Sequence, residues 1–197
     1  MLRALPFGLP LLLASVSAAQ SPPLLQPTGR ALNGGAMTNV VVTRTSVTFV
    51  ASEPMQSADL NGDGDQADVV VQVHDLRTGG TRSLAAVNYF VPPVASDRYS
   101  AFGVSEFAEG GQDLNGDGDA TDTVAFVFDR ATGQKRNLGI AMGTAYAEKH
   151  GAVITDRVFA FSASEPDQGV DLDGDGVLAR CLYVVDLVTG VGSGVAP

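Results

Sequence analysis

The sequence predicts an all-β, β-propeller-like fold of three four-stranded antiparallel blades. A module of three features recurs three times in the same order, and its acidic loops begin at nearly constant spacing, at Asp59, Asp113 and Asp171. Each module also holds four short runs typical of strands in roughly 50 residues, which is the size of a propeller blade. No amphipathic helical pattern of useful length follows residue 19.

The first two runs of each module are separated by a tight connection. The first candidate strands are "NVVVTRT" from Asn39, "FVPPVAS" from Phe90 and "GAVITD" from Gly151. The second run alternates between apolar and polar residues, which indicates a strand, and it ends in Ser-Glu. The three second runs are "VTFVASE" to Glu53, "SAFGVSE" to Glu106 and "VFAFSASE" to Glu165.

The third run follows the acidic loop and is apolar at nearly every position, as expected of a strand covered on both faces. It closes with Asp-x-x-Thr-Gly, at Gly79, Gly133 and Gly190. That motif predicts an Asx-type turn with a glycine free to adopt positive φ, and so a hairpin to a fourth strand. The fourth strands are "TRSLAA", "KRNLGIA" and a weak, glycine-rich "VGSGVAP".

The modules cover residues 37–86, 87–140 and 141–197. Propellers normally need at least about four blades to close around an axis, so three leave an open edge. The chain is then a fragment of a longer one, or two chains complete a ring, or the three sheets stack without closing. We favour the fragment, because an exposed sheet edge invites aggregation.

The start of the chain resembles a cleaved secretory signal. A basic Met-Leu-Arg opening, an apolar run broken by two prolines and a Ser-Ala-Ala end predict a signal peptide over 1–19. Residues 20–36, rich in proline, predict an extended leader. No later stretch reaches the roughly 20 apolar residues of a membrane helix, so we expect an exported protein without a membrane span. Its one cysteine, Cys181, lies in an apolar run and is expected to be a buried small side chain.

The negative charge of the chain is concentrated in the three loops. The formal net charge is −10, but half of the 22 acidic residues lie in these loops, and the others nearly balance the 12 Lys and Arg. The acidity therefore belongs to three sites and not to a general surface. The sequence predicts no nucleic-acid partner.

The first two loops match the needs of calcium, which binds six to eight oxygens held by a sharply turning loop. We number each loop from its first Asp; oxygen-bearing side chains then fall at positions one, three, five, seven and ten, with glycines at four and six. The predicted ligands are Asp59, Asn61, Asp63, Asp65 and Asp68 in the first loop, and Asp113, Asn115, Asp117, Asp119 and Asp122 in the second.

Other interpretations of these loops are weaker. A solvated Asx turn explains one or two of the five residues. Magnesium demands tighter octahedral geometry, and zinc or copper would favour His or Cys, which all three loops lack. The third loop keeps only Asp171, Asp173 and Asp175, with Val177 and Arg180 at positions seven and ten. Arg180 is expected to neutralise these aspartates in a turn without metal, so two calcium sites are predicted and a third is doubtful.

The loop "DLNGDGD" resembles the calcium loops of EF-hands and dockerins. Its setting between strands is similar to the loops of integrin-α FG-GAP blades, and the whole module resembles repeats of secreted bacterial TolB-like or WD-repeat-like propellers. Position twelve is Val70, Val124 or Leu182 and not the glutamate of an EF-hand, so no helix-loop-helix is implied. The acid at position ten also departs from the position nine of integrin-type loops. The glutamates that precede the loops either supply a further oxygen or end a strand in solvent.

Three functions follow as hypotheses. The first is a secreted calcium-binding module with a structural or ligand-binding role, for which the resemblance implies a glycan or protein ligand at the loop face. The second is a calcium-dependent surface adhesion or assembly protein that self-associates through open sheet edges. The third, a propeller hydrolase or lyase, has little support, because His74 and His150 lie in no nucleophile motif and no catalytic residue is predicted.

Overall fold

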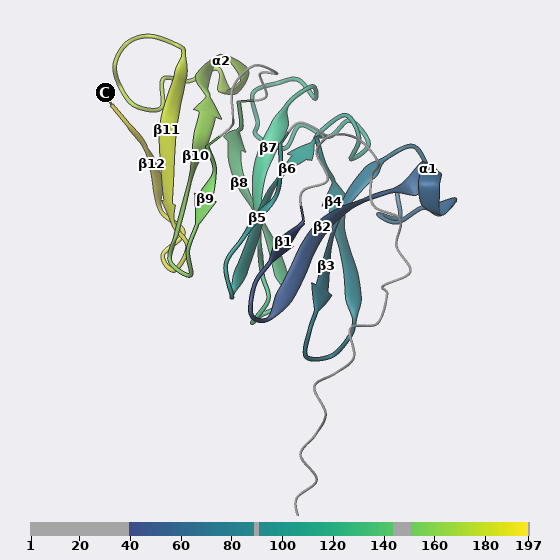
Figure 1. The fold of residues 1–197 in the computed structure, drawn as a ribbon. Helices are drawn as coiled ribbons and strands as arrows, with labels where there is room; N and C mark the ends of the chain where they lie inside the picture. Colours follow the sequence, from purple (N-terminus) through teal and green to yellow (C-terminus); the bar gives the residue numbers. More distant parts are fainter. Residues whose placement is uncertain (1–39, 89–90, 144–150, 197) are drawn as a thin grey trace, which may run out of the picture.

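The computed structural model describes residues 40–88, 91–143 and 151–196, and these form three four-stranded antiparallel sheets (Figure 1). Each module forms one sheet, whose strands lie side by side in chain order. The predicted signal peptide and leader lie outside the described residues. The first sheet contains β1 (Val41–Val42), β2 (Ser46–Ser52), β3 (Val69–Asp75) and β4 (Thr81–Ala86).

The second and third sheets repeat this plan. The second contains β5 (Val94–Ala95), β6 (Tyr99–Ser105), β7 (Thr123–Asp129) and β8 (Gln134–Ala141). The third contains β9 (Val153–Ile154), β10 (Val158–Ser164), β11 (Arg180–Asp186) and β12 (Gly192–Val195). Two one-turn helices, α1 (Glu53–Gln56) and α2 (Glu165–Gln168), follow β2 and β10. None of the helices in the described part of the chain is long and apolar enough to cross a membrane.

The first strand of each sheet is much shorter than the run that predicted it. Each spans two residues, although the apolar pattern covers about six. In the second sheet the reason is local: Pro92 and Pro93 have no backbone N–H to donate, so the ladder begins only at Val94. The longer second and third strands pair over seven residues in every sheet and form its centre.

The Asp-x-x-Thr-Gly motifs form the predicted hairpin turns. Asp75 Oδ1 accepts hydrogen bonds from the amides of Arg77 (2.8 Å) and Thr78 (2.7 Å). Gly79 closes the turn at φ 73°, where a side chain would be strained, and its amide donates to the carbonyl of Asp75 at 2.9 Å. In the turns at Asp129 and Asp186, the amide of the closing glycine likewise donates to the carbonyl of the aspartate, at 2.8 Å in both.

The three sheets stack face to face and bury two apolar cores. Each sheet has a forward face, which points to the next sheet along the chain, and a backward face on the opposite side. Alternate residues of a strand lie on opposite faces, so Val71 and Val73 of β3 point forward, as do Ala125 and Val127 of β7. The core between the first and second sheets includes Val71, Val73, Phe102, Val124 and Phe126. The core between the second and third sheets includes Ala125, Val127, Phe159, Phe161 and Val185.

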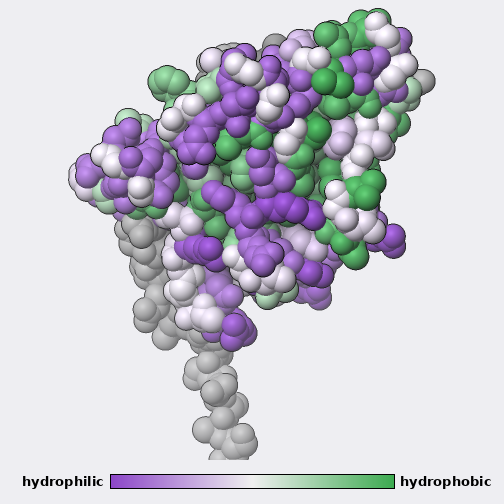
Figure 2. Space-filling model, turned by 180° about the vertical axis from the view of Figure 1, so that it is seen from behind, coloured by the Kyte–Doolittle hydropathy of each residue, from purple (hydrophilic) through white to green (hydrophobic). Residues whose placement is uncertain are grey.

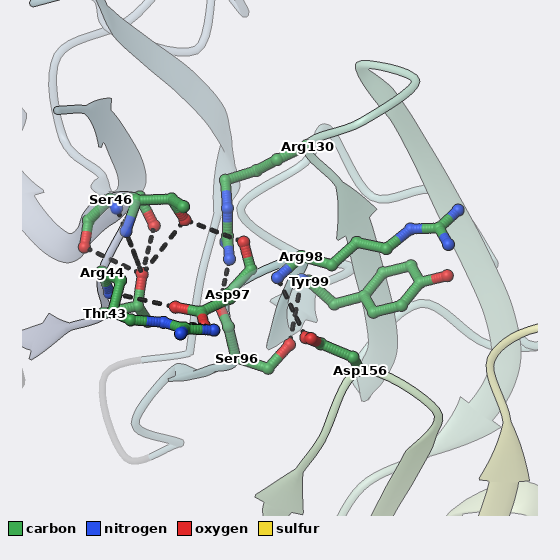
Figure 3. A network of polar contacts seen from close by, with 10 residues as sticks. Thr43, Arg44, Ser46, Ser96, Asp97, Arg98, Tyr99, Arg130 and Asp156 are labelled. Carbon is green, nitrogen blue, oxygen red and sulfur yellow. Dashed lines mark hydrogen bonds and ion pairs between the residues drawn. The ribbon is translucent and has the colours of Figure 1, made fainter. Parts of the chain in front are cut away.

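Polar contacts between tight turns also link neighbouring sheets at the end opposite the acidic loops (Figure 3). The amide of Arg44 donates to Asp97 Oδ1 at 3.0 Å, and the amide of Arg98 donates to Asp156 Oδ1 at 3.1 Å. Arg130 reaches inward from the second sheet, and its Nη1 donates to Ser100 Oγ at 2.7 Å. Each aspartate therefore joins the turn of its own sheet to the turn of the preceding one.

The structure confirms the all-β fold and the three four-stranded antiparallel sheets. The described residues form no closed barrel or propeller. Closure is therefore not shown, and the propeller-like arrangement stays a prediction.

Candidate metal-binding loops

The three acidic loops link the second strand of each sheet to the third, as predicted, and lie at the upper end of the sheets in Figure 1. In each loop the aspartate at position one organises the turn. Asp59 Oδ1 accepts the amide of Gly62 at 2.6 Å, and its Oδ2 accepts the amide of Gly64 at 3.1 Å. Asp113 and Asp171 form the same pair of bonds to the glycines at positions four and six of their loops. These glycines all have positive φ, between 79° and 107°.

The side chains at positions three, five and seven continue a ladder of Asx turns. Asn61 Oδ1 accepts the amide of Asp63 at 3.2 Å, Asp63 Oδ1 that of Asp65 at 3.0 Å, and Asp65 Oδ1 that of Ala67 at 2.7 Å. The second loop repeats all three bonds. Each oxygen-bearing residue thus fixes the backbone two residues further on, which is why the alternating sequence gives one defined curl.

The acid at position ten returns to the start of the loop. Asn61 Nδ2 donates to Asp68 Oδ2 at 3.2 Å, and Asn115 Nδ2 donates to Asp122 Oδ2 at 3.1 Å. Partial burial, followed by the neighbouring carboxylate of Asp63, raises the pKa of Asp68 to about 7. Burial, followed by Asp117, likewise raises the pKa of Asp122 to about 7. Near neutral pH these two carboxyls hold a proton part of the time unless a cation replaces it.

The glutamates that directly follow the second strands are fully buried, so the interpretation that they end a strand in solvent is wrong. Glu53 Oε1 accepts the amide of Leu60 at 2.6 Å, and its Oε2 accepts the amide of Asp68 at 3.1 Å. One carboxylate therefore binds both ends of the first loop. Glu106 binds Leu114 and Asp122 in the same way.

Glu165 has the same role in the third loop. Its Oε1 accepts the amide of Leu172 at 2.7 Å, and its Oε2 accepts the amide of Ala179 at 2.9 Å. The bond from Ala179 is the main reason that the pKa of Glu165 lies below its ordinary value. Sequence reasoning missed this function, although the constant Ser-Glu before each loop was a signal for it.

Carboxylate oxygens lie close together where each of the first two loops returns to its sheet. Glu53, Asp65 and Asp68 each place one oxygen within 4.8 Å of the others, and Glu106, Asp119 and Asp122 do the same. In the part of the chain that the structure describes, no such group joins positions one and five of these loops to positions seven and ten. The structure therefore brings together two of the predicted acids of each loop, with a glutamate as third member.

The third loop keeps the glycine turn formed by its first aspartate, but the acidic residues that lie close together in it are different. Asp171, Asp173 and Asp175 lie with one oxygen each within 4.8 Å of one another. Val177 and Leu178 are exposed where the first two loops carry Asp65 and Gln66, or Asp119 and Ala120. Cys181 is free and buried, as predicted, and burial raises the pKa of its thiol to about 11.

Two other features bear on the hydrolase hypothesis. His74, at the end of β3, has its Nδ1 2.9 Å from Thr81 Oγ1 of the neighbouring strand, and His150 lies outside the described residues. A cleft of about 220 Å³ opens where the second sheet meets the turn after β11, with Arg98, Tyr99 and Asp129 in its wall. It is smaller than the roughly 300–1,000 Å³ of typical small-molecule sites.

No protein-family model matches the chain, and a search of curated proteins finds no match to it.

Proposed function

We propose that the chain is a secreted calcium-binding module of β-propeller type, in which calcium at the first two loops stabilises the blades. The observation that carries the proposal is the group of three carboxylates where each of these loops returns to its sheet. Two carboxylates held about 4 Å apart repel by roughly 4 kcal/mol at an effective dielectric constant of 20. A divalent cation removes that repulsion and takes the place of the proton that Asp68 or Asp122 otherwise holds.

The choice of calcium follows from the donor set. Every candidate ligand in the first two loops is an oxygen, from a carboxylate, an amide or a backbone carbonyl, and calcium accepts six to eight such ligands in variable geometry. Asp65 and Asp68 would hold the ion in the first loop with Glu53 beside them, and Asp119 and Asp122 in the second with Glu106. Asn61 and Asn115 offer a further oxygen if their amides turn, because Nδ2 now faces Asp68 or Asp122.

The proposed role is structural first. A metal that binds only the folded state adds stability by mass action, about 2.7 kcal/mol per site when the free ion exceeds its dissociation constant a hundredfold. Since the one cysteine cannot form a disulfide within the chain, this contribution would replace the usual covalent support of an exported protein. The exposed loops at one end of the sheets also offer a calcium-bridged contact to a glycan or protein ligand.

Calorimetric titration of residues 20–197 with calcium, with melting followed in parallel, tests the proposal. We expect two sites, a melting temperature that falls in excess chelator, and loss of both sites in the Asp65→Ala, Asp119→Ala double variant, because these acids belong to the two carboxylate groups. Val177→Ala is the matched control, because it changes position seven of the third loop and should leave both sites intact. A melting temperature that chelator does not change would overturn the proposal.

A further inference from the structure

The cleft between the second and third sheets contains an arginine that has no partner among the described residues. Arg136 of β8 pairs with Val127, so its side chain lies on the forward face of the second sheet. A Cβ atom added to Gly190 would lie 3.1 Å from Nη1 of Arg136, so the guanidinium reaches the turn that follows β11. It is half-buried, and it forms no hydrogen bond or ion pair with any residue that the structure describes.

The corresponding arginine of the first sheet has two partners. Arg82 and Arg136 each pair with the valine two residues before the aspartate of the turn motif, so they hold equivalent positions. Nη1 of Arg82 donates to the carbonyl of Gly133, the closing glycine of the next sheet, at 3.0 Å. Its guanidinium carbon also lies 5.1 Å from the ring centre of Phe128. These contacts offset the loss of water around a charge that lies between two sheets.

A difference between the repeats explains why Arg136 lacks these contacts. Phe128 directly precedes the turn aspartate of the second sheet, and the residue at that position in the third sheet is Val185, which has no ring. The ring at this interface comes instead from Tyr99. Arg98 lies over it, with its guanidinium carbon 4.9 Å from the ring centre, and Figure 3 shows the two side chains next to each other. Arg136 is therefore left without the ring that Arg82 has.

The cleft, of about 220 Å³, keeps one positive charge that no acid offsets. Arg98 and Arg136 both line it, together with Asp129. Nε and Nη2 of Arg98 donate to Asp129, at 3.2 and 2.9 Å, so these two charges balance each other. The charge of Arg136 remains, which makes the cleft suitable for an anion although the chain as a whole is acidic.

Part of the lining is apolar. Val127 and Leu187 are at most 4% exposed, and Val188 lies beside them with 68% of its surface exposed. The third module, to which Val188 belongs, carries eight of the twelve large apolar side chains that are exposed in the described ranges, and they gather along the right side of Figure 2. A ligand in the cleft therefore meets apolar surface next to the charge.

We propose that this cleft binds a small organic anion, in which a carboxylate pairs with Arg136 and carries a short apolar group. A carboxylate matches the planar fork of a guanidinium with two parallel hydrogen bonds. One unpaired cation balances one negative charge, whereas burying the second charge of a phosphate would cost free energy. The volume is below the roughly 300 Å³ of sites for drug-sized ligands, so the apolar group must be short.

The anion site goes beyond the proposed calcium function and does not depend on it. Arg98 belongs to a tight turn and Thr132 to a hairpin turn, so the cleft lies at the end of the sheets opposite the acidic loops. Two sources offer the same chemistry: a free short-chain acid, and the terminal carboxylate of a peptide whose last residue is apolar.

Calorimetric titration of residues 20–197 with isocaproate and with N-acetyl-leucine tests the proposal and distinguishes the two sources. We expect one site with a dissociation constant of about 1 mM, as for ligands of few atoms, with the same affinity in calcium and in chelator. The tighter of the two probes identifies the source as a free acid or a peptide end. Isocaproamide, which has the same shape without the charge, should not bind.

Arg136→Gln should weaken binding at least about tenfold, because it removes a charged hydrogen-bond donor. Arg82→Gln is the matched control, because it changes the equivalent arginine outside the cleft and should leave the affinity unchanged. Val188→Asp adds a negative charge on an exposed turn and should also weaken binding, so it replaces Arg136→Gln if that variant fails to fold.

Several outcomes would overturn the proposal. Neither acid might bind, isocaproamide or inorganic phosphate might bind as tightly as the acids, or Arg136→Gln might bind like the parent. Binding that disappears in chelator would also overturn it, because the carboxylate would then bind through calcium at the loops and not at Arg136.

Discussion

The buried glutamates show how one side chain fixes the path of a loop. Burying a carboxylate costs several kcal/mol unless hydrogen bonds satisfy it. Glu106 is satisfied by amides from both ends of its loop, at 2.6 Å from Leu114 and 2.9 Å from Asp122. Bonds from amides to a charged acceptor are about twice as strong as bonds between neutral groups. Because it binds both ends of the loop, each glutamate has a structural function that does not need the ion. Its carboxylate also lies next to the acids proposed to bind calcium.

Replacement of this acceptor should therefore destabilise the chain even without metal. In Glu106→Gln one oxygen becomes an amide nitrogen, which leaves a buried backbone donor without a partner and costs about 1–3 kcal/mol. Urea unfolding in excess chelator measures the loss. Asp119→Asn is the control, because its remaining Oδ1 still accepts the amide of Thr121. Equal stability of Glu106→Gln and the parent would show that the loop does not depend on this contact.

The acids at position ten should couple calcium binding to pH. Asp68 and Asp122 have pKa values raised to about 7, and calcium needs the deprotonated forms, so binding releases protons below that pH and affinity rises as pH increases through it. In the metal-free protein the sign is opposite. The folded state holds these protons more tightly than the unfolded state, so the associated stability is present below the ordinary pKa of 3.8 and is lost as pH rises toward about 7.

Calorimetry in two buffers of different ionisation enthalpy measures this proton release. We expect release at pH 6 and little at pH 8.5. Heats that are independent of the buffer at pH 6 would show that Asp68 and Asp122 are already ionised in the metal-free protein.

At the scale of the loops, the third keeps the first turn of its siblings but is one residue shorter where it returns to the sheet, since its glutamate binds the amide at position nine and not at position ten. Its Asp171 holds Gly174 and Gly176 at 2.6 and 2.9 Å, as in the other two loops. What it lacks are the acid at position seven and the acid whose amide binds the glutamate, in whose place it carries Ala179. The glycine turn therefore depends on Asp-x-x-Gly-x-Gly, whereas the group of carboxylates next to the glutamate needs two further acids.

Restoring those acids should restore a site. We expect the Val177→Asp, Ala179→Asp variant to bind three calcium ions per chain instead of two, because Asp171 already forms the glycine turn and Ala179 lies where Asp68 and Asp122 bind the glutamate. Equilibrium dialysis measures the stoichiometry, and Val188→Asp, outside the loop, controls for added charge. A stoichiometry of two in the variant would mean that backbone shape and these acids are not sufficient.

The elements were predictable where their signal is local. Alternation, the Asp-x-x-Thr-Gly turns and the repeated acidic loops predicted all twelve strands in order, because each depends on residues a few positions apart. The role of Glu53 was not predictable in this way. A glutamate at a strand end is compatible with solvent as well as burial, and its partners are backbone amides seven and fifteen residues further on, which carry no side-chain signature.

At the scale of the whole molecule, stability depends on the cores between sheets. Phe161 is completely buried between the second and third sheets, with its ring 4.7 Å from that of Phe159 and 5.7 Å from that of Tyr183. The sequence indicated a register shared with Phe49 and Phe102, but not which sheet each ring would contact. Stacking order depends on contacts between modules, which periodicity within one module does not encode.

Truncation of this ring should strongly destabilise the chain. Phe161→Ala removes a buried aromatic side chain and leaves a cavity, at a cost of about 3–5 kcal/mol. Val188→Ala, on an exposed turn, should change stability by less than about 0.5 kcal/mol. Thermal and urea unfolding of both variants give the comparison. Similar values for the two would mean that the second and third sheets do not unfold as one unit.

Because one glutamate binds both ends of each loop, these loops are suitable sites for engineered insertions. Between Leu60 and Asp68 the chain departs from the sheet and returns to the same carboxylate. A foreign peptide inserted between these two residues would begin and end at fixed positions. Its length and composition could therefore change while the strands on either side stay in register.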